Sequence, residues 1–431
     1  MFCVRAQRGR FFIPDTESGE DIKDTMNTRD TRKKLLLLGG SRYLLPAIKA
    51  AHDLGVYVIT CDYLPHNYAH QFADEYHNVS IIDKEAVLEL AQKLHIDGIM
   101  SYATDPGVAT AAYVAEKMHL PGNNPYESVA ILQNKGRFRH FLQEHGFKVP
   151  KMKTFRDWNE VKLSLTDIEY PVIVKPTDSA GSKGVSRVDR EQDLEAAVSY
   201  ALNHSIGHEC IIEQFIEKDG FSTDTDSFSV DGKLVFFSLN DQWFDTQAAN
   251  EYTPAAYCWP STMPANFQNE LHDEIQRLLT LLHMGTSIYN IETRLGKDGK
   301  AYIMEVSPRA GGNRLAEMLR YATGQDIIRA SVQGAMGLPI APLNMPEYHG
   351  HWGIAILHSK KEGIFKGIQY DELIVDKIVE KDVWVNPGDK VEPFTGANES
   401  LGTLVLHCST HEELVDTLKN LSNLVKIELE S

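Results

Sequence analysis

One stretch of this 431-residue chain constrains its fold more than any other. It runs from Ile291 to Arg314 and reads IETRLGKDGKAYIMEVSPRAGGNR. Asp298-Gly299 is a two-residue hairpin signal, because Gly accepts the positive φ that tight hairpin turns need. Strand-like segments flank this signal, at Ser287–Arg294 and Ala301–Val306. The stretch therefore predicts an antiparallel hairpin with its turn centred between residues 298 and 299.

The predicted hairpin places two carboxylates opposite each other. Glu292 lies as far before the turn centre as Glu305 lies after it. Opposed like charges destabilise a hairpin, and a divalent cation with a phosphate ligand would offset their repulsion. Because side chains alternate between the faces of a strand, Arg294, Ser307 and Arg309 should share the face of the carboxylates. The pattern favours a metal-bound polyanion site. The alternative is a solvated face with Glu–Arg pairs, and a one-residue bulge would change the register.

Charge and cysteine usage restrict the class of protein. The net charge of −17 argues against nucleic acid as a partner, because phosphate neutralisation needs clustered Lys and Arg. The five cysteines lie far apart without metal-ligand spacing, which is typical of reduced thiols in a cytoplasmic protein. No apolar run approaches the roughly 18 residues that span a membrane. We therefore expect a cytoplasmic protein that acts on small molecules, and this interpretation allows a homodimer.

Residues 1–32 carry charge without clear periodicity. They have no continuous apolar core for a secretory signal, and the acids from Asp15 to Asp30 speak against a mitochondrial presequence. Met26 looks like a natural start just before the first strand. We predict that residues 1–32 are a disordered extension.

The segment 33–125 alternates strands and helices. The apolar run Lys34–Leu38 ends in Gly39-Gly40-Ser41, and a helix and a second strand that ends at Asp62 follow. This order predicts a doubly wound parallel sheet. Asp62 lies where a dinucleotide-binding protein has its ribose acid, but two glycines of the fingerprint are missing, so NAD stays an alternative.

A second phosphate signal lies upstream of the hairpin. The predicted strand Val172–Pro176 includes Lys175, and the small-residue loop 178–185 with Lys183 follows it. Backbone N–H groups and two ammonium groups can close over a triphosphate. This is not a P-loop, because G-x-x-x-x-G-K-[ST] is absent; a mobile surface hairpin is the alternative. The irregular, aromatic-rich stretch 243–264 suggests a substrate lid, although its aromatics would fit a core as well.

With these motifs in hand, the chain resembles the ATP-grasp superfamily of carboxylate–amine ligases, in its biotin-carboxylase-like and L-amino-acid-ligase branch. The motifs appear in the family's order: the helix with Lys135, VKP with SAGSKGVSRV, EQFI, IETR and MEVSPRAGGN. The resemblance implies an α/β and α+β multidomain protein. It comprises the pre-ATP-grasp domain at 33–125, an ATP-grasp domain at 126–345 with a small lobe at about 150–216, and a C-terminal α+β lobe at 346–431.

The resemblance also implies roles for single residues. Lys175 would act in catalysis together with Arg309, which would steady the acyl phosphate. The ATP-binding residues would be Lys135, Lys175, Ser182, Lys183, Gly184, Glu213, Phe215, Ile216 and Glu217. The ligands of one or two Mg²⁺ or Mn²⁺ ions would be Glu292, Glu305 and Ser307. The substrate would be bound by Arg294, Gly311, Gly312, Asn313 and Arg314.

Two positions depart from the family pattern. Ser307 stands where the family has Asn as a third metal ligand, which puts the second ion in doubt. The ribose-binding acid falls near Phe221-Ser222, and Glu217 and Asp219 are the candidate substitutes.

The predicted activity is an ATP-dependent ligase. It would join a small-molecule carboxylate, for example an amino acid, to an amine through an acyl phosphate, and release ADP and phosphate. One alternative is a bicarbonate-using carboxylase or a carbamoyl-phosphate-type enzyme, although the chain carries no Met-Lys biotin-attachment motif. The other is a nucleotide-binding module without turnover.

Overall fold

A four-stranded parallel sheet forms the N-terminal part, as predicted. Its order is β3-β2-β1-β4, with β1 (Lys34–Leu38), β2 (Tyr57–Cys61), β3 (Glu75–His77) and β4 (Gly98–Ser101). In β1, Leu35 and Leu37 face one apolar cluster and Leu36 and Leu38 face another, so both faces of the sheet are covered. The covering helices are α1 (Leu45–Asp53), α2 (Lys84–Leu94) and α3 (Val108–Met118).

The computed structural model describes residues 31–430 except 123, 167 and 180–182. The predicted disordered extension therefore lies almost wholly outside the described residues, as does Ser182. Residues from Lys33 onward form one compact unit. No helix in the described ranges is long and apolar enough to cross a membrane.

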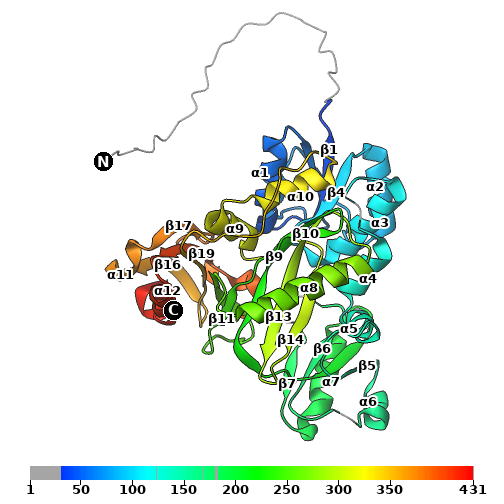
Figure 1. Cartoon of the computed structure of the whole chain (residues 1–431). Coiled ribbons are helices and arrows are strands. Elements are labelled where there is room, and N and C mark those ends of the chain that lie inside the picture. Colours follow the sequence, from blue (N-terminus) through cyan, green and yellow to red (C-terminus); the bar gives the residue numbers. More distant parts are fainter. Residues whose placement is uncertain (1–30, 123, 167, 180–182, 431) are drawn as a thin grey trace, which may run out of the picture. The chain divides into compact units, whose positions relative to one another are not determined.

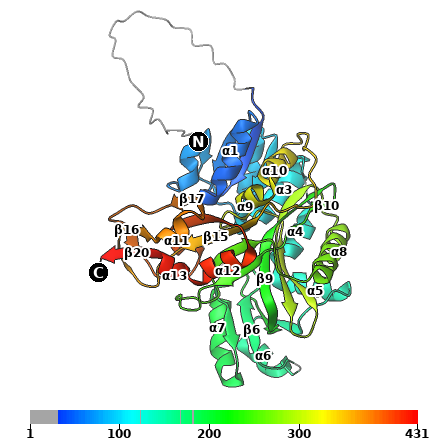
Figure 2. The ribbon, with the colours of Figure 1, turned by 60° about the vertical axis from the view of Figure 1, so that its left-hand side comes forward.

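A small antiparallel sheet corresponds to the predicted lobe. The helices α4 (Tyr126–Gln133) and α5 (Lys135–Glu144) lead into it. Its order is β5-β8-β6-β7, and α6 (Trp158–Ser164) and α7 (Leu194–Asn203) pack against it in Figure 2. The strands are β5 (Met152–Phe155), β6 (Val172–Pro176), β7 (Ser186–Val188) and β8 (Cys210–Gln214).

The central element is a nine-stranded antiparallel sheet. Its path is β14-β13-β9-β11-β12-β15-β19-β17, and β10 pairs with β9 at one side. Helix α8 (Ala265–Leu281) lies across β13 and β14 in Figure 1 and packs its apolar face onto them. The strands of this sheet that lie before residue 346 are β9 (Lys218–Val230), β10 (Lys233–Phe236), β11 (Asp241–Phe244), β12 (Pro254–Trp259), β13 (Ser287–Gly296) and β14 (Ala301–Ser307).

Two helices connect the N-terminal sheet to the central sheet. They are α9 (Leu315–Thr323) and α10 (Ile327–Ala335), and α10 lies beside α1 in Figure 1 and Figure 2. The same apolar cluster includes residues of α1, α9, α10 and the central sheet.

The last part of the chain contributes strands to two sheets. β15 (His351–Leu357), β17 (Ile378–Val383) and β19 (Gly402–Cys408) continue the central sheet beyond β12. A separate three-stranded sheet has the order β18-β16-β20. The remaining elements are β16 (Gly363–Tyr370), α11 (Glu372–Val375), β18 (Lys390–Val391), α12 (His411–Lys419), α13 (Leu421–Leu424) and β20 (Val425–Glu430). The predicted domain boundaries stay predictions, and the sheet runs across the one at 346.

The prediction of an irregular lid at 243–264 is wrong. The segment contains all of β12 and the end of β11, and β12 pairs with β11 and β15 inside the central sheet. Tyr257 and Trp259 are almost fully buried. The prolines suggested a loop, but Pro254 opens the strand and Pro260 follows its last residue, where a missing N–H breaks no interior ladder.

Candidate active site

The hairpin β13–β14 places Glu292 directly opposite Glu305, as predicted. The route to this register differs from the prediction. Gly296 to Gly299 form the turn, with Gly299 at φ +72°. Next to the turn, each residue of β13 pairs with a residue of β14 one position earlier than a turn centred between 298 and 299 would give. A bulge between Glu292 and Thr293 shifts the ladder back by one residue. The turn geometry and the bulge compensate, so the two carboxylates face each other.

A third carboxylate extends this row onto the next strand. Asp224 of β9 opposes Glu292, so the row across β14, β13 and β9 reads Glu305, Glu292, Asp224. The next row toward Ser307 contains Asn290 and Asp226. Alternation along the strands places all these side chains on one face. Sequence reasoning missed both aspartates, although their i, i+2 spacing on a strand is the signal that could have revealed them.

Lys175 belongs to a buried ion-pair triad. Its Nζ contacts Glu213 Oε1, while Arg139 Nε donates to Glu213 Oε2 at 3.0 Å. Burial alone would raise the pKa of Glu213, but the two cations lower it to about 2. Burial together with Arg139 and Lys135 lowers the pKa of Lys175. Cations therefore engage both oxygens of the Glu213 carboxylate, and its predicted contact with ATP stays a prediction.

Lys135 links the small sheet to the hairpin. It opens α5, and its Nζ donates to the carbonyl of Ser179 at 2.9 Å and lies 3.5 Å from Glu305 Oε2. Lys183, on the loop after β6, is exposed, and Gly184 is buried with φ +75°. A Cβ at Gly184 would lie 2.7 Å from Pro176 and His204, so only glycine fits there.

Three of the predicted ATP-binding residues follow β8 directly. Phe215 stacks under the Arg187 guanidinium, whose central carbon lies 4.5 Å from the ring centroid. Ile216 is buried, and its carbonyl accepts from Arg294 Nη1 at 3.3 Å. Glu217 is exposed and pairs with Lys297 Nζ. Glu217 and Asp219, the two candidates for the ribose-binding acid, are both exposed, so exposure does not distinguish them.

Ser307 and Arg309 meet an acid that sequence reasoning missed. Asp105, just after β4, accepts from Arg309 Nε at 2.8 Å and from Arg309 Nη2 at 2.6 Å. Ser307 Oγ donates to Asp105 at 3.0 Å and accepts from Gln133 Nε2 at 2.8 Å. Burial would raise the pKa of Asp105, but Arg309 lowers it. The rule that ligands bind outside the carboxyl ends of parallel strands could have drawn attention to Asp105.

The segment after Arg309 closes the other side of the carboxylate face. The N–H of Gly311 donates to Asp226 Oδ1 at 2.7 Å, and Gly312 has open space where a Cβ would be. Asn313 accepts from the hydroxyl of Tyr43 at 3.2 Å. The prediction placed Arg314 near the substrate. Its guanidinium instead pairs with three acids and ties α9 to β17: Glu317, Glu380 and Asp382.

The residues present fit a magnesium ion that is partly coordinated by phosphate. Burial and Glu305 raise the pKa of Glu292, and Arg294 Nη2, at 3.7 Å from its Oε1, only partly offsets them. No group of three or more His, Cys, Asp or Glu side chains suited to a metal occurs in the described part of the chain. Mg²⁺ is commonly held by one or two carboxylates together with substrate phosphates and water, so two glutamates are sufficient.

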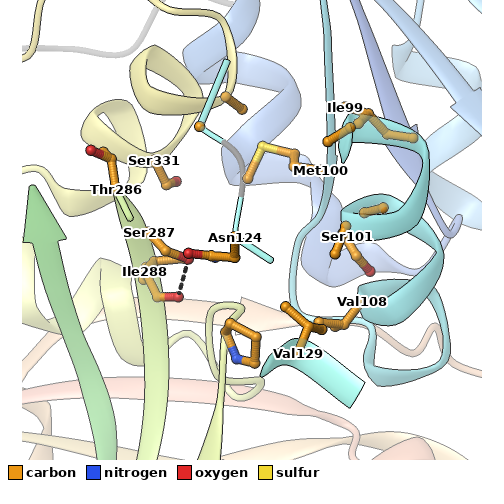
Figure 3. Close-up of a pocket in the computed structure, with 16 residues that line it drawn as sticks. Ile99, Met100, Ser101, Val108, Asn124, Val129, Thr286, Ser287, Ile288 and Ser331 are labelled. Atoms are coloured by element: carbon orange, nitrogen blue, oxygen red, sulfur yellow. Dashed lines mark hydrogen bonds between the residues drawn. The ribbon is translucent and has the colours of Figure 1, made fainter. Parts of the chain in front are cut away.

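A separate cavity lies between β4, α3, α10 and β13 (Figure 3). Its volume is about 70 Å³, which is room for a few water molecules and not for a nucleotide. Ser101, Asn124, Ser287 and Ser331 supply its polar lining, and Ser287 Oγ donates to the carbonyl of Ile288. None of the carboxylates or lysines described above lines it, so we assign the candidate active site to the sheet face.

The fold and the site together define the class of protein. Residues 168–317 match the family described as the ATP-grasp domain, and two solved structures share the fold over 93% of this chain. This confirms the predicted resemblance and the predicted fold class.

Three known proteins show how far the similarity extends. The formate-dependent phosphoribosylglycinamide formyltransferase of Bacteroides thetaiotaomicron is 25% identical over 90% of this chain and 97% of its own length. A carbamoyl phosphate synthase large chain of Thermotoga petrophila is 26% identical over 61% of this chain. The aligned region is only 23% of the length of that protein. The L-amino acid ligase of Bacillus licheniformis has a TM-score of 0.76 at 21% identity, covering 93% of this chain and 99% of that structure.

Proposed function

We propose that the chain is an ATP-dependent ligase that joins a small-molecule carboxylate to an amine through an acyl phosphate. The observation that carries this proposal is the sheet face where Glu292 opposes Glu305, with Lys135 beside it and Arg309 two residues past the end of β14. The proposed products are ADP and phosphate. The proposed cofactors are ATP and one or two Mg²⁺ or Mn²⁺ ions.

The chain's own residues supply positioning and charge in this mechanism. Glu292 and Glu305 would hold the divalent ion, which would neutralise phosphate charge. Lys135, Lys175 and Lys183 would offset the remaining charge of the triphosphate. Arg309, fixed by its bidentate pair with Asp105, stabilises the acyl phosphate and the oxyanion that forms when the amine attacks.

Names among the similar proteins support a ligase. The L-amino acid ligase and the phosphoribosylglycinamide synthetase from Anaerococcus prevotii share this fold across 93% of the chain. Both names describe the joining of a carboxylate to an amine. The proposal includes small-molecule substrates, a cytoplasmic location, no nucleic acid or membrane partner, and a homodimer as one possible assembly.

The products of ATP test the mechanism. The protein with MgATP and each of the twenty amino acids should release phosphate and ADP for at least one of them. AMP and pyrophosphate as products would overturn the acyl-phosphate mechanism, because phosphoryl transfer from ATP leaves ADP.

A bicarbonate-using enzyme is the second candidate. Carbamoyl phosphate synthase large chains are among the similar sequences, and one structure of the same fold is a biotin carboxylase domain with MgADP and bicarbonate. ATP hydrolysis that requires bicarbonate and no amino acid, measured with and without biotin, would favour this candidate. ATP binding without any turnover would instead indicate a nucleotide-binding module.

A further inference from the structure

Most carboxylates of the candidate active site have a cationic partner, and two do not. Each of four acids has a Lys or Arg nitrogen within 4.0 Å: Asp105, Glu213, Glu292 and Glu305. Asp224 and Asp226 differ. Among the residues that the structure describes, no Lys, Arg or His nitrogen lies within 4.0 Å of either carboxylate. The nearby Arg309 guanidinium is already paired with Asp105.

The partners of this aspartate pair are neutral. Asp224 accepts from Asn290 Nδ2 at 2.8 Å and from the Tyr257 hydroxyl at 3.1 Å. Asp226 accepts from the N–H of Gly311 at 2.7 Å and more weakly from Asn290. Asp226 is fully buried, and its Oδ2 has no hydrogen-bond partner at all. Asp224 is only half-buried, so it is the member of the pair that a ligand can reach.

Two neighbouring carboxylates without a cation, one half-buried and one buried, are costly, because desolvation penalises each charge and the charges repel. Burial raises the pKa of Asp224 to about 6 and that of Asp226 to about 7, which agrees with a missing positive charge. An organic cation at the open side of Asp224 would supply that charge.

The position of the pair matches the place where an amine must arrive. Asp224 lies one strand beyond Glu292, and neighbouring strands are about 4.8 Å apart. On the other side, a chain of hydrogen bonds runs from Asp224 through Tyr257 and Asn313 to Tyr43 in the N-terminal part. An ammonium group on Asp224 would thus lie between the glutamates proposed to hold the metal ion and the loop 311–313, within reach of an acyl phosphate.

We propose that Asp224, supported by Asp226, binds the ammonium group of the amine substrate, which is therefore a primary amine that arrives protonated. This inference rests on the proposed ligase function. In the reaction the amine nitrogen forms the C–N bond and the C–O bond to phosphate breaks. One ammonium proton leaves with hydrogen phosphate, one is released to water, and the third stays on the amide nitrogen.

Hydroxylamine separates this site from the ligase mechanism. It is an uncharged nucleophile at neutral pH that converts acyl phosphates to hydroxamates, so it does not need an ammonium site. The assay uses MgATP, the twenty amino acids as carboxylates, and either hydroxylamine or the twenty amino acids and spermidine as amines. In Asp224→Asn the KM for the amine should rise about 10- to 100-fold, as expected for a lost charged hydrogen bond. The KM for the carboxylate and the rate with hydroxylamine should change less than about threefold.

Asp273→Asn is the matched control, because Asp273 is 83% exposed on α8 and should leave every parameter unchanged. Unchanged hydroxamate formation also shows that Asp224→Asn folds. Hydroxamate formation without use of any amine would overturn the ammonium site and leave the ligase function standing. A raised KM for the carboxylate alone, or rescue of Asp224→Asn by added K⁺ or Mg²⁺, would equally overturn it. No hydroxamate with any carboxylate would contradict the proposed function itself.

Discussion

Glu305 is the residue at which the proposed metal ion and phosphates would meet Lys135. It opposes Glu292 across the hairpin and lies 3.5 Å from Lys135 Nζ. Glu305→Gln keeps the shape of the side chain and removes its charge, so the ion that neutralises the phosphates should bind poorly. We expect ATP turnover to fall by at least about 100-fold, as for other losses of transition-state charge stabilisation. A coupled ADP assay measures the loss, with Glu274→Gln on α8 as control.

The aspartate pair predicts an unusual pH dependence of stability without ligand. Burial is the main cause that raises the pKa of Asp224 to about 6 and of Asp226 to about 7, from 3.8. The folded chain holds these protons to higher pH than the unfolded chain does. The contribution of the protonated aspartates to the free energy of unfolding is therefore complete below about pH 4, and it is lost as the pH rises through 6 and 7.

We expect Asp226→Asn to reduce this loss. Between pH 5 and pH 8 the free energy of unfolding of the variant should fall by about 1–2 kcal/mol less than that of the wild type. Urea unfolding at both values measures the difference, and Asp273→Asn should keep the wild-type slope. Equal slopes for Asp226→Asn and the wild type would mean that the carboxylate is ionised across this range.

Among the elements, two glycines with positive φ should respond differently to substitution by alanine. Gly299 has φ +72°, and no atom lies within 4 Å of the position that a Cβ would occupy, so Gly299→Ala should cost about 1–2 kcal/mol from backbone strain alone. Gly402 begins β19 with φ +148°, and a Cβ there would lie 2.2 Å from the Asp382 carbonyl of β17. Gly402→Ala should therefore cost clearly more, about 3 kcal/mol or above. Urea unfolding of the two variants gives the comparison, and equal losses would contradict it.

The elements also show what the sequence could predict and why the rest escaped. The apolar run located β1 to the residue, and alternation with turn chemistry paired Glu292 with Glu305. The bulge that completes this register leaves no local signal, because it depends on the whole ladder. Asp224 and Asp226 were missed because they become neighbours of the glutamates only when β9 pairs with β13.

The site depends on contacts between distant segments. Asp105 pairs with Arg309, which lies 204 positions away in the sequence. Tyr257 contacts Asp224 from β12, a segment that was predicted to be part of a lid. No spacing in the sequence encodes such meetings. The individual motifs indicated phosphate and metal chemistry, while only the folded sheet shows which acids lack a cation.

For the whole molecule, the central sheet predicts what happens to folding when the C-terminal part is removed. β15 pairs with β12 along its length, and Ile354, Ile356 and Val405 share an apolar cluster with Trp259. Removing residues 346–431 would expose β12 as an open edge and uncover Trp259. Each buried aliphatic side chain that is lost costs about 2 kcal/mol, so a few of them equal the roughly 5–15 kcal/mol of a typical domain.

We therefore expect a chain ended at residue 345 to be insoluble or unfolded, because an unpaired apolar strand edge also promotes aggregation. Solubility on expression, circular dichroism and ATP binding measure the outcome, with the full chain as reference. A soluble truncated chain that binds ATP would show that the predicted ATP-grasp domain, 126–345, folds without the last strands. The strands before residue 346 would then be stable without the strands that follow, and the predicted boundary at 346 would be a true domain border.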